Sequence, residues 1–224
     1  KFQKRTPDIC VPEHQKMIMR DTPWGRMTYI DYKYKVELGK QEYDQIDAYS
    51  RQKPVAWSAS VWDLNSLEFL SQYELPFIKI PSAMMTNTDL VAESAKTKLP
   101  IIMSTGMSTL PEVDKAVNNV LKYNDNLVLM HTNSSYPTPN EEINLNLIPF
   151  LKERYGCVIG YSGHEQDLEP TVIAIALGAE VVERHITISH ELWGTDQKSS
   201  LEIMAMDMLY KRAKDIKTIL GSSK

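Results

Sequence analysis

The stretch "VIGYSGHE" (residues 158–165) decides the fold of this chain. It begins as a short apolar run and ends in a serine, a glycine and His164. The stretch "VVERHI" (residues 181–186) follows the same plan, because its apolar start leads into a glutamate, an arginine and His185. Each run is too short for a helix and almost continuously apolar, which is typical of a parallel strand covered on both faces. Two successive strands that end on metal-binding residue types indicate one shared site.

Further strands are predicted along the whole chain. They lie at residues 1–4 ("KFQK", the end of a strand), 55–60 ("VAWSAS"), 77–82 ("FIKIPS"), 100–105 ("PIIMST") and 127–132 ("LVLMHT"). Helices are expected between them, with an Asp cap, a proline near the start or helical spacing of apolar residues as signals. These are residues 63–73, 109–124 and 167–180, the last mostly buried with Gly178 near its end. The strands recur every 20–30 residues or so, which is the period of a repeated βα unit.

Repeated βα units form either an open doubly wound sheet or a (β/α)₈ TIM barrel. The sequence has no G-x-G-x-x-G turn, and polar residues follow every predicted strand instead of gathering at one crevice. Both features favour the barrel, whose site is assembled at the C-terminal ends of many strands. We therefore predict one TIM-barrel domain over residues 1–224, with one strand missing before residue 1. The N-terminal lysine indicates a fragment or a processed chain.

The segment at about residues 7–54 interrupts the βα period. It holds a Pro-Trp-Gly turn, a tyrosine-rich stretch and a predicted helix, and it reads as an insertion. Such an insertion over a barrel is a lid or binding loop, or equally a surface for a partner protein.

Composition excludes several classes of function. The net charge of −4 provides no basic field for nucleic acid, and no apolar run approaches the ~20 residues that cross a bilayer. The N-terminus lacks the apolar centre of a signal peptide. Two cysteines are too few for a disulfide framework or a zinc cluster, so a reducing, cytoplasmic compartment is expected.

Polar side chains at the predicted strand ends are candidates for one site. They are Lys1, Gln3, Ser58, Ser60, Lys79, Ser82, Ser104, Thr105, His131, Asn133, Ser134, Tyr136, Ser162, His164, Glu183 and His185. Lysines and hydroxyls that converge on one mouth suit a phosphate or a carboxylate. His164 and His185 on successive strands can share a divalent cation. His131 lies inside an apolar run, and we expect it to be structural.

Lys79 lies between two isoleucines on a strand that should be covered on both faces, so we expect it to pair with a ligand. A desolvated lysine inside a barrel is also the nucleophile of a Schiff-base (class I) aldolase. That chemistry needs no metal and would leave His164 and His185 without a role. It is the alternative function.

The motifs "KFQ", "FIKIPS", "IIMSTGM", "SSYPTP", "IGYSGHE" and "VERHIT", in this order and spacing, resemble the sialic acid synthases (N-acetylneuraminate synthase family). The resemblance runs from Lys1 to about Leu220. It implies a TIM barrel, a divalent cation (Mn²⁺ or Mg²⁺), no organic cofactor, and a homodimer. The family's C-terminal antifreeze-like domain is absent from this sequence, as is a glutamate on the family's first strand.

The resemblance also implies roles for individual residues. His164 and His185 match the family's metal ligands. The family residues that hold the phosphate of phosphoenolpyruvate match Lys79, Ser82, Ser104 and Ser162. Lys1 and Ser134 match positions near the substrate carboxylate. Residues that match Gln3, Tyr136, Glu183 and Asp196 line the sugar side, and Glu183, Tyr136 and Lys79 are the catalytic candidates.

The reaction that the resemblance implies joins phosphoenolpyruvate to an N-acetylhexosamine and releases phosphate. The product is a nine-carbon sialic acid. The sugar is N-acetylmannosamine, its 6-phosphate, or a precursor of legionaminic or pseudaminic acid. A non-catalytic barrel that only binds ligand is a further alternative, which the retention of Lys79, His164 and His185 disfavours.

Overall fold

The computed structural model describes residues 1–222 and divides them into two compact units. The first unit comprises Lys1–Ile102 and Asp114–Asn126, and the second comprises Met103–Val113 and the chain from Leu127 onward. The predicted domain 1–224 ends two residues beyond the described chain. None of the described helices is both long enough and apolar enough to cross a membrane.

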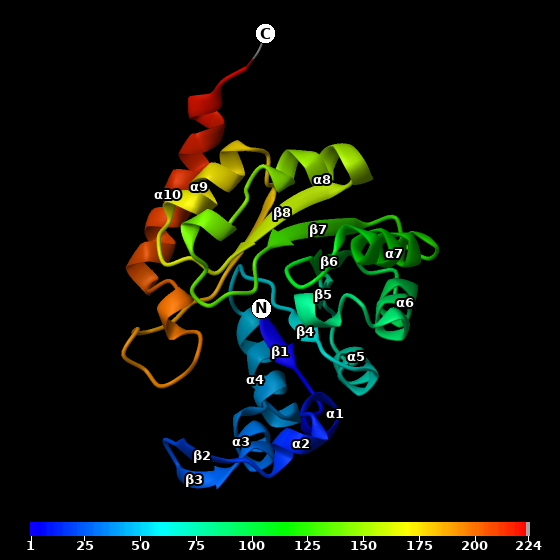
Figure 1. Ribbon diagram of the computed structural model, residues 1–224, viewed down its shortest axis with the longest axis vertical. Coiled ribbons are helices and arrows are strands. Elements are labelled where there is room, and N and C mark those ends of the chain that lie inside the picture. The colour runs from blue at the N-terminus through cyan, green and yellow to red at the C-terminus, as the bar shows by residue number, and fades with distance from the viewer. Residues whose placement is uncertain (223–224) are drawn as a thin grey trace. The chain divides into compact units, whose positions relative to one another are not determined.

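Seven strands form one sheet, in the order β1-β4-β5-β6-β7-β8-β9, and a separate hairpin pairs β2 with β3 (Figure 1). The pairs β1–β4, β4–β5, β7–β8 and β8–β9 are parallel. This arrangement confirms the α/β class and the seven strands predicted from the apolar runs. The eighth strand of a complete barrel stays a prediction.

The first unit contains the N-terminal strands and their helices. Their bounds are β1 (Phe2–Lys4), α1 (Pro7–Cys10), α2 (Glu13–Lys16), β2 (Met19–Thr22), β3 (Gly25–Thr28), α3 (Tyr29–Val36), α4 (Lys40–Arg51), β4 (Ala59–Val61), α5 (Leu64–Leu70), β5 (Ile78–Ile80), a 3₁₀ helix (Ser82–Met84) and α6 (Thr88–Lys96). Two further elements, β6 (Ile101–Ser104) and α7 (Leu110–Leu121), are each divided between the units.

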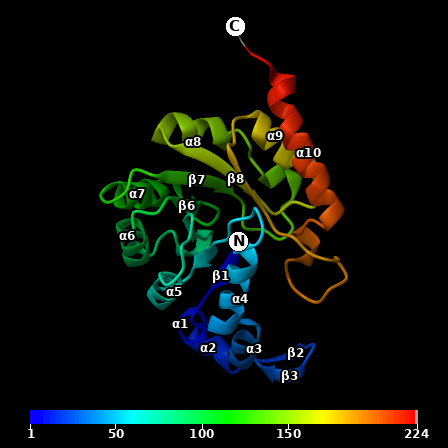
Figure 2. The ribbon, with the colours of Figure 1, turned by 180° about the vertical axis from the view of Figure 1, so that it is seen from behind.

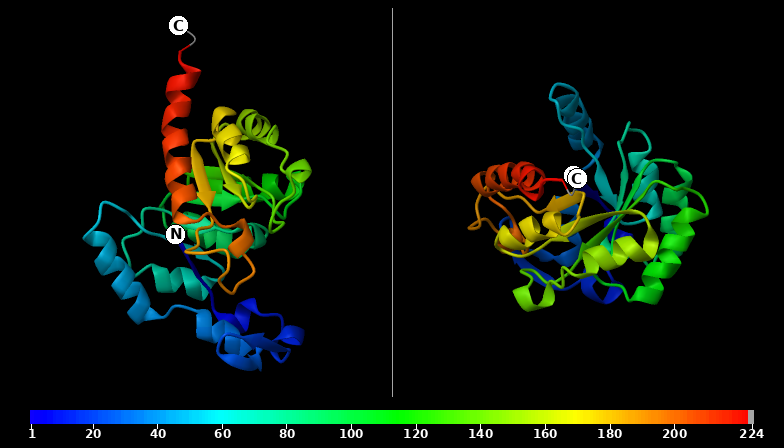
Figure 3. Two further views of the ribbon diagram at one scale, coloured as in Figure 1. Left: turned by 90° about the vertical axis from the view of Figure 1, so that its left-hand side faces the viewer. Right: turned by 90° about the horizontal axis from the view of Figure 1, so that it is seen from above.

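The second unit contains the remaining elements. These are β7 (Leu127–Thr132), a 3₁₀ helix (Asn140–Glu142), α8 (Leu147–Tyr155), β8 (Val158–Gly163), α9 (Glu169–Ala176), β9 (Val181–Arg184), a 3₁₀ helix (Gln197–Ser199) and α10 (Ile203–Leu220). Helices α8 and α9 lie on the same side of β8, and α10 lies beside α9 (Figure 1 and Figure 2). Leu168, Leu201 and Leu209 form the buried apolar cluster that joins α10 to α9. The left view of Figure 3 shows α10 as one long helix (red).

One predicted boundary and one predicted burial were wrong. The strand predicted at 55–60 begins at Ala59, because Val55 is 65% exposed and the Trp57 indole donates a hydrogen bond to Asp47 of α4 (3.0 Å) instead of leading into a ladder. The helix predicted as mostly buried is α9, in which Ile173 is 50% exposed. Only one face of α9 packs, so a helix rich in apolar residues is half-exposed.

The predicted insertion at about residues 7–54 consists of the short helices α1 and α2, the hairpin β2–β3 around the Pro-Trp-Gly turn, and helices α3 and α4. The tyrosine-rich stretch is itself the helix α3, begun by Thr28, whose hydroxyl accepts a hydrogen bond from the Asp31 backbone N–H (3.2 Å). Tyr43 of α4 is fully buried and donates a hydrogen bond to the Gln3 carbonyl (2.8 Å). That contact fixes α4 to the strand that carries Gln3.

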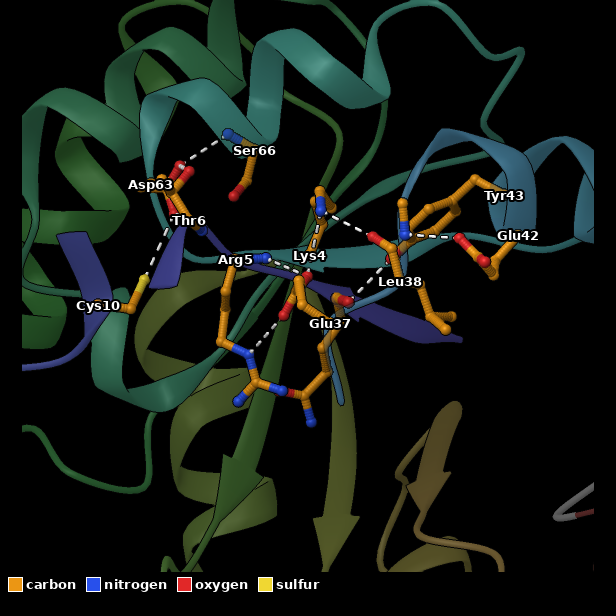
Figure 4. Close-up of polar contacts among 12 residues, drawn as sticks. Lys4, Arg5, Thr6, Cys10, Glu37, Leu38, Glu42, Tyr43, Asp63 and Ser66 are labelled. Carbon is orange, nitrogen blue, oxygen red and sulfur yellow. Dashed lines mark hydrogen bonds and ion pairs between the residues drawn. The ribbon is translucent and has the colours of Figure 1, made fainter. Parts of the chain in front are cut away.

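Asp63 joins the ends of β1 and β4 in the first unit (Figure 4). Its carboxylate caps α5 by accepting from the Ser66 N–H (2.7 Å), and it also accepts from the N–H (2.7 Å) and hydroxyl (2.9 Å) of Thr6. Burial by itself raises the pKa of Asp63, but the hydrogen bonds from Thr6 and Ser66 outweigh burial and hold the pKa below its ordinary value.

Asp63→Ala is expected to lower the free energy of unfolding by about 3 kcal/mol. The loss combines a missing helix cap with a partly buried N–H of Thr6 that no longer has an acceptor. Urea unfolding followed by circular dichroism measures it. Asp44→Ala, which removes an exposed carboxylate paired with Lys40, is the control and should cost less than about 1 kcal/mol. Equal losses for the two variants would contradict this role of Asp63.

Candidate active site

Three aromatic rings of the second unit lie together where β7, β8 and β9 end. Tyr136 follows β7, His164 follows β8 and His185 follows β9. The ring centroids of the two histidines are 5.2 Å apart, and the Tyr136 ring lies 4.1 Å from that of His164 and 5.7 Å from that of His185. The structure therefore brings together the three strand-end residues that the sequence placed in one site.

His164 is held by its backbone surroundings. Its side chain is 4% exposed, and its Nδ1 lies 2.6 Å from the Asn133 carbonyl. Because a carbonyl only accepts, Nδ1 carries the proton and Nε2 keeps its lone pair. Burial, together with the nearby His185, lowers the pKa of His164 to about 4, so the ring is neutral at pH 7.

The stability of the metal-free protein is expected to fall as the pH drops from about 6.5 to about 4. The folded pKa of His164 lies below the value of 6.5 for a free histidine, so the unfolded chain takes up the proton first and is favoured by acid. The loss is at most about 3 kcal/mol. Urea unfolding in EDTA between pH 7 and pH 4.5 measures it. His164→Gln should lack this part of the pH dependence, and an unchanged profile would contradict the assignment.

Two carboxylates, Glu183 and Asp196, lie near the ring cluster. Ser162 donates a hydrogen bond to Glu183 (3.2 Å), its partner in the β8–β9 register. Asp196 Oδ2 lies 3.7 Å from Nδ1 of His185. Burial, together with the charges of Asp196 and Glu183, raises the pKa of the Tyr136 hydroxyl to about 12. Tyr136 is therefore a neutral hydrogen-bond donor at neutral pH.

The donor set suits a divalent cation in part. Two neighbouring imidazoles, one of them fixed through its other nitrogen by a carbonyl, are typical of a metal site. Among residues 1–222, no group of three or more His, Cys, Asp or Glu side chains is placed to hold a metal ion. The two histidines supply part of the ligand set of such a site.

Two predicted serines also lie in the second unit. Ser104 ends β6 and is buried, and Ser134 lies in the loop after β7. A Cβ on Gly106 would lie 2.6 Å from the Ser134 hydroxyl oxygen and 3.0 Å from the Thr132 carbonyl. The glycine of "STGM" is therefore required for the close approach of these two loops.

Six of the predicted residues belong to the first unit: Lys1, Gln3, Ser58, Ser60, Lys79 and Ser82. Gln3, Ser60 and Lys79 are register partners on β1, β4 and β5, and register partners on parallel strands share a face of the sheet. Lys79 is 1% exposed, and its amine donates to the Ile80 carbonyl (3.2 Å). Within the described chain, the buried Gln3 Oε1 and Ser60 Oγ have no hydrogen-bond partner.

Lys1 and Ser82 stand at the edges of this row. Lys1 is exposed before β1, and Ser82 begins the 3₁₀ helix after β5. A cavity of about 190 Å³ in the same unit is lined by Arg5, Cys10 and Lys33, among others, and none of its lining residues is a predicted site residue.

The surroundings of His131 agree with the structural role predicted for it. Its Nε2 lies 2.6 Å from the Ile143 carbonyl, and the residue is 4% exposed. Sequence reasoning did not assign roles to Glu165 and Arg184. Both side chains are 1% exposed and lie 2.9 Å apart. The available signal was a charged residue directly beside each histidine, in "GHE" and "ERH".

Comparisons with known proteins identify the family of this chain. The family model "NeuB family" matches residues 1–224. The chain is 40% identical over 184 residues to the N-acetylneuraminate-9-phosphate synthase of Drosophila melanogaster, covering 81% of this chain and 49% of that protein. It is 33% identical to the N,N'-diacetyllegionaminic acid synthase of Campylobacter jejuni, covering 84% of this chain and 57% of that protein.

A crystal structure of the N-acetylneuraminic acid synthetase of Leptospira borgpetersenii, in complex with citrate, superposes with a TM-score of 0.84 at 31% identity. The match covers 87% of this chain and 68% of that one. This chain spans about half the length of the curated relatives it matches. The match of the family model over all 224 residues shows that the chain belongs to the NeuB family, the family of the sialic acid synthases.

Proposed function

We propose that this chain is the catalytic barrel of a synthase that condenses phosphoenolpyruvate with N-acetylmannosamine or its 6-phosphate. The observation that carries the proposal is the cluster of Tyr136, His164 and His185, with Glu183 hydrogen-bonded beside it. The 40% identity to a protein named N-acetylneuraminate-9-phosphate synthase supports the choice of sugar.

His164 and His185 would hold Mn²⁺ or Mg²⁺. A bound cation supplies Lewis acidity toward the aldehyde oxygen of the open-chain sugar. The chain's own residues orient the sugar: Tyr136 donates a hydrogen bond from a hydroxyl that stays protonated, and Glu183 and Asp196 accept from sugar hydroxyls. Gln3 offers a buried, unpartnered carbonyl oxygen for the same purpose.

Lys79, Ser82, Ser104 and Ser162 would bind the phosphate, with Lys1 and Ser134 near the carboxylate of phosphoenolpyruvate. C3 of phosphoenolpyruvate attacks the aldehyde carbon, water adds at C2, and the tetrahedral intermediate expels phosphate with cleavage of the C–O bond. The buried ammonium of Lys79 stabilises the charge that grows on the departing phosphate, and burial strengthens that interaction.

The test uses the full-length protein with Mn²⁺, phosphoenolpyruvate and either sugar. Phosphate and ulosonic acid are measured together, and the proposal expects one of each per turnover with at least one of the two sugars. Product only with the diamino sugars that lead to legionaminic or pseudaminic acid would change the substrate and keep the reaction. If neither phosphate nor ulosonic acid formed with any of these sugars, that result would contradict the proposal.

The second candidate function is a Schiff-base aldolase, and it rests on the burial of Lys79 alone. It requires an unprotonated amine that attacks a keto acid. Borohydride treatment with pyruvate would then reduce a covalent adduct on Lys79, which mass spectrometry detects. The synthase proposal expects no adduct.

A further inference from the structure

Glu165 and Arg184 form an ion pair that the proposed reaction does not use. The Arg184 Nη1 lies 2.9 Å from the Glu165 Oε1, and both side chains are 1% exposed. Each residue is the direct chain neighbour of a histidine, since Glu165 follows His164 and Arg184 precedes His185. The pair therefore connects the two strand ends that carry the proposed metal ligands.

Every oxygen of the Glu165 carboxylate is engaged. Tyr161 donates to Oε2 (2.8 Å), and Thr171 of α9 donates to Oε1 (2.7 Å) beside the contact from Arg184. A Cβ on Gly163 would lie 2.5 and 2.7 Å from the two carboxylate oxygens. Only glycine at that position lets the carboxylate turn back toward β8.

Arg184 binds four acceptors from one position. Nη1 donates to Glu165 Oε1, to Thr171 Oγ1 (2.9 Å) and to the Asp167 carbonyl (3.2 Å), and Nη2 donates to the Glu165 carbonyl. Two of these acceptors are backbone carbonyls of the loop that follows His164. A planar guanidinium can satisfy this fork, whereas a lysine ammonium is a point charge.

We call the group Tyr161, Glu165, Thr171 and Arg184 the clamp. The strand register shows which face of the sheet its arginine occupies. The β8–β9 register ends at the pair Gly163–Arg184, and side chains alternate between the faces of a strand. Ser162 and Glu183, the pair before it, therefore point to the opposite face from Arg184. The backbone ladder stops one residue short of each histidine, and the clamp continues the connection past that point.

We propose that the Glu165–Arg184 clamp positions His164 and His185 for metal binding. The inference rests on the proposed function, because that function gives the histidines their role. A buried ion pair is not required for stability, since well-packed apolar residues of similar volume serve as well. What apolar residues cannot supply is a directional link between the Glu165 carbonyl and the strand that bears His185.

The test is Arg184→Lys in the full-length protein, with Arg212→Lys as the matched control. Arg212 of α10 forms an ion pair with Glu169 at a similar N···O distance (2.8 Å), but this pair is exposed. We expect Arg184→Lys to weaken Mn²⁺ binding, measured by calorimetry, about 10- to 100-fold. At saturating Mn²⁺, kcat should fall while the KM for phosphoenolpyruvate stays unchanged. Arg212→Lys should match the wild type in all of these.

A paired variant, Glu165→Gln with Arg184→Met, separates positioning from folding. It removes both charges together, so it leaves no unpaired buried charge, and it should keep the circular dichroism spectrum and weaken Mn²⁺ binding to a similar degree. Folded variants with wild-type Mn²⁺ affinity would overturn the inference.

Imidazole ¹⁵N NMR spectra distinguish a failure of the clamp from a failure of the proposed function. Wild-type protein that binds no divalent cation contradicts the proposed function. The positioning role of the clamp is then tested by the spectra of the metal-free protein. Arg184→Lys should shift the signals of His164 and His185 and leave that of His131 in place. Unshifted signals for His164 and His185 would overturn the clamp.

Discussion

Replacing His164 by alanine is expected to lower kcat about 100- to 1000-fold in the full-length protein with Mn²⁺. Loss of one of two imidazole ligands removes the cation from the site, and Lewis-acid stabilisation of this kind supplies several kcal/mol to a transition state. The buried ring also loses its hydrogen bond to the Asn133 carbonyl, so the melting temperature should drop by a few degrees. Far-ultraviolet circular dichroism should stay unchanged.

His190→Ala is the matched control for this experiment. His190 belongs to the same unit, its side chain is 48% exposed, and its Nε2 lies 2.8 Å from the Ser200 carbonyl. It should keep wild-type kcat and the same dependence on Mn²⁺. If His164→Ala kept activity in buffer freed of metal by EDTA, the role assigned to His164 would be wrong.

Replacing Lys79 by methionine is expected to raise the KM for phosphoenolpyruvate about 10- to 100-fold and to leave the KM for the sugar within twofold. A charge-assisted hydrogen bond to phosphate is worth about 1.5–3 kcal/mol. Lys79 is 1% exposed on β5, between two buried isoleucines, so methionine of similar length should fill the space. The melting temperature should be at least that of the wild type, because no charge remains to be buried.

Lys96→Met is the control for Lys79→Met, since Lys96 lies in the same unit with a side chain that is 47% exposed and paired with Glu93. It should leave both KM values unchanged. Equal increases in the two KM values for Lys79→Met would argue against a phosphate contact. Complete loss of turnover together with loss of a borohydride-trapped adduct would favour the Schiff-base aldolase.

The strands of this fold could be predicted because parallel strands covered on both faces are apolar throughout. The runs at Leu127–Thr132 and Val158–Gly163 are the observed strands β7 and β8. The exposure of one face of α9 could not be predicted, because that face carries the apolar residue Ile173. Composition marks which residues can be buried, whereas the packing of neighbouring helices decides which are.

The candidate site was partly predictable for a similar reason. The C-terminal ends of adjacent parallel strands lie at one edge of the sheet, so residues such as His164 and His185 had to approach each other. The partners that fix them come from loops and from the opposite face of the strands. The Asn133 carbonyl and the Arg184 fork depend on backbone paths that no spacing in the sequence encodes.

The most direct test of the proposed reaction follows the oxygen that bridges C2 and phosphorus in phosphoenolpyruvate. Substrate labelled there with ¹⁸O is incubated with the full-length protein, Mn²⁺ and the sugar that gives turnover, and the released phosphate is analysed by ³¹P NMR. Cleavage of the C–O bond predicts one ¹⁸O atom in each phosphate and one ulosonic acid per phosphate. Unlabelled phosphate, or ulosonic acid formed from pyruvate without phosphate, would contradict the account.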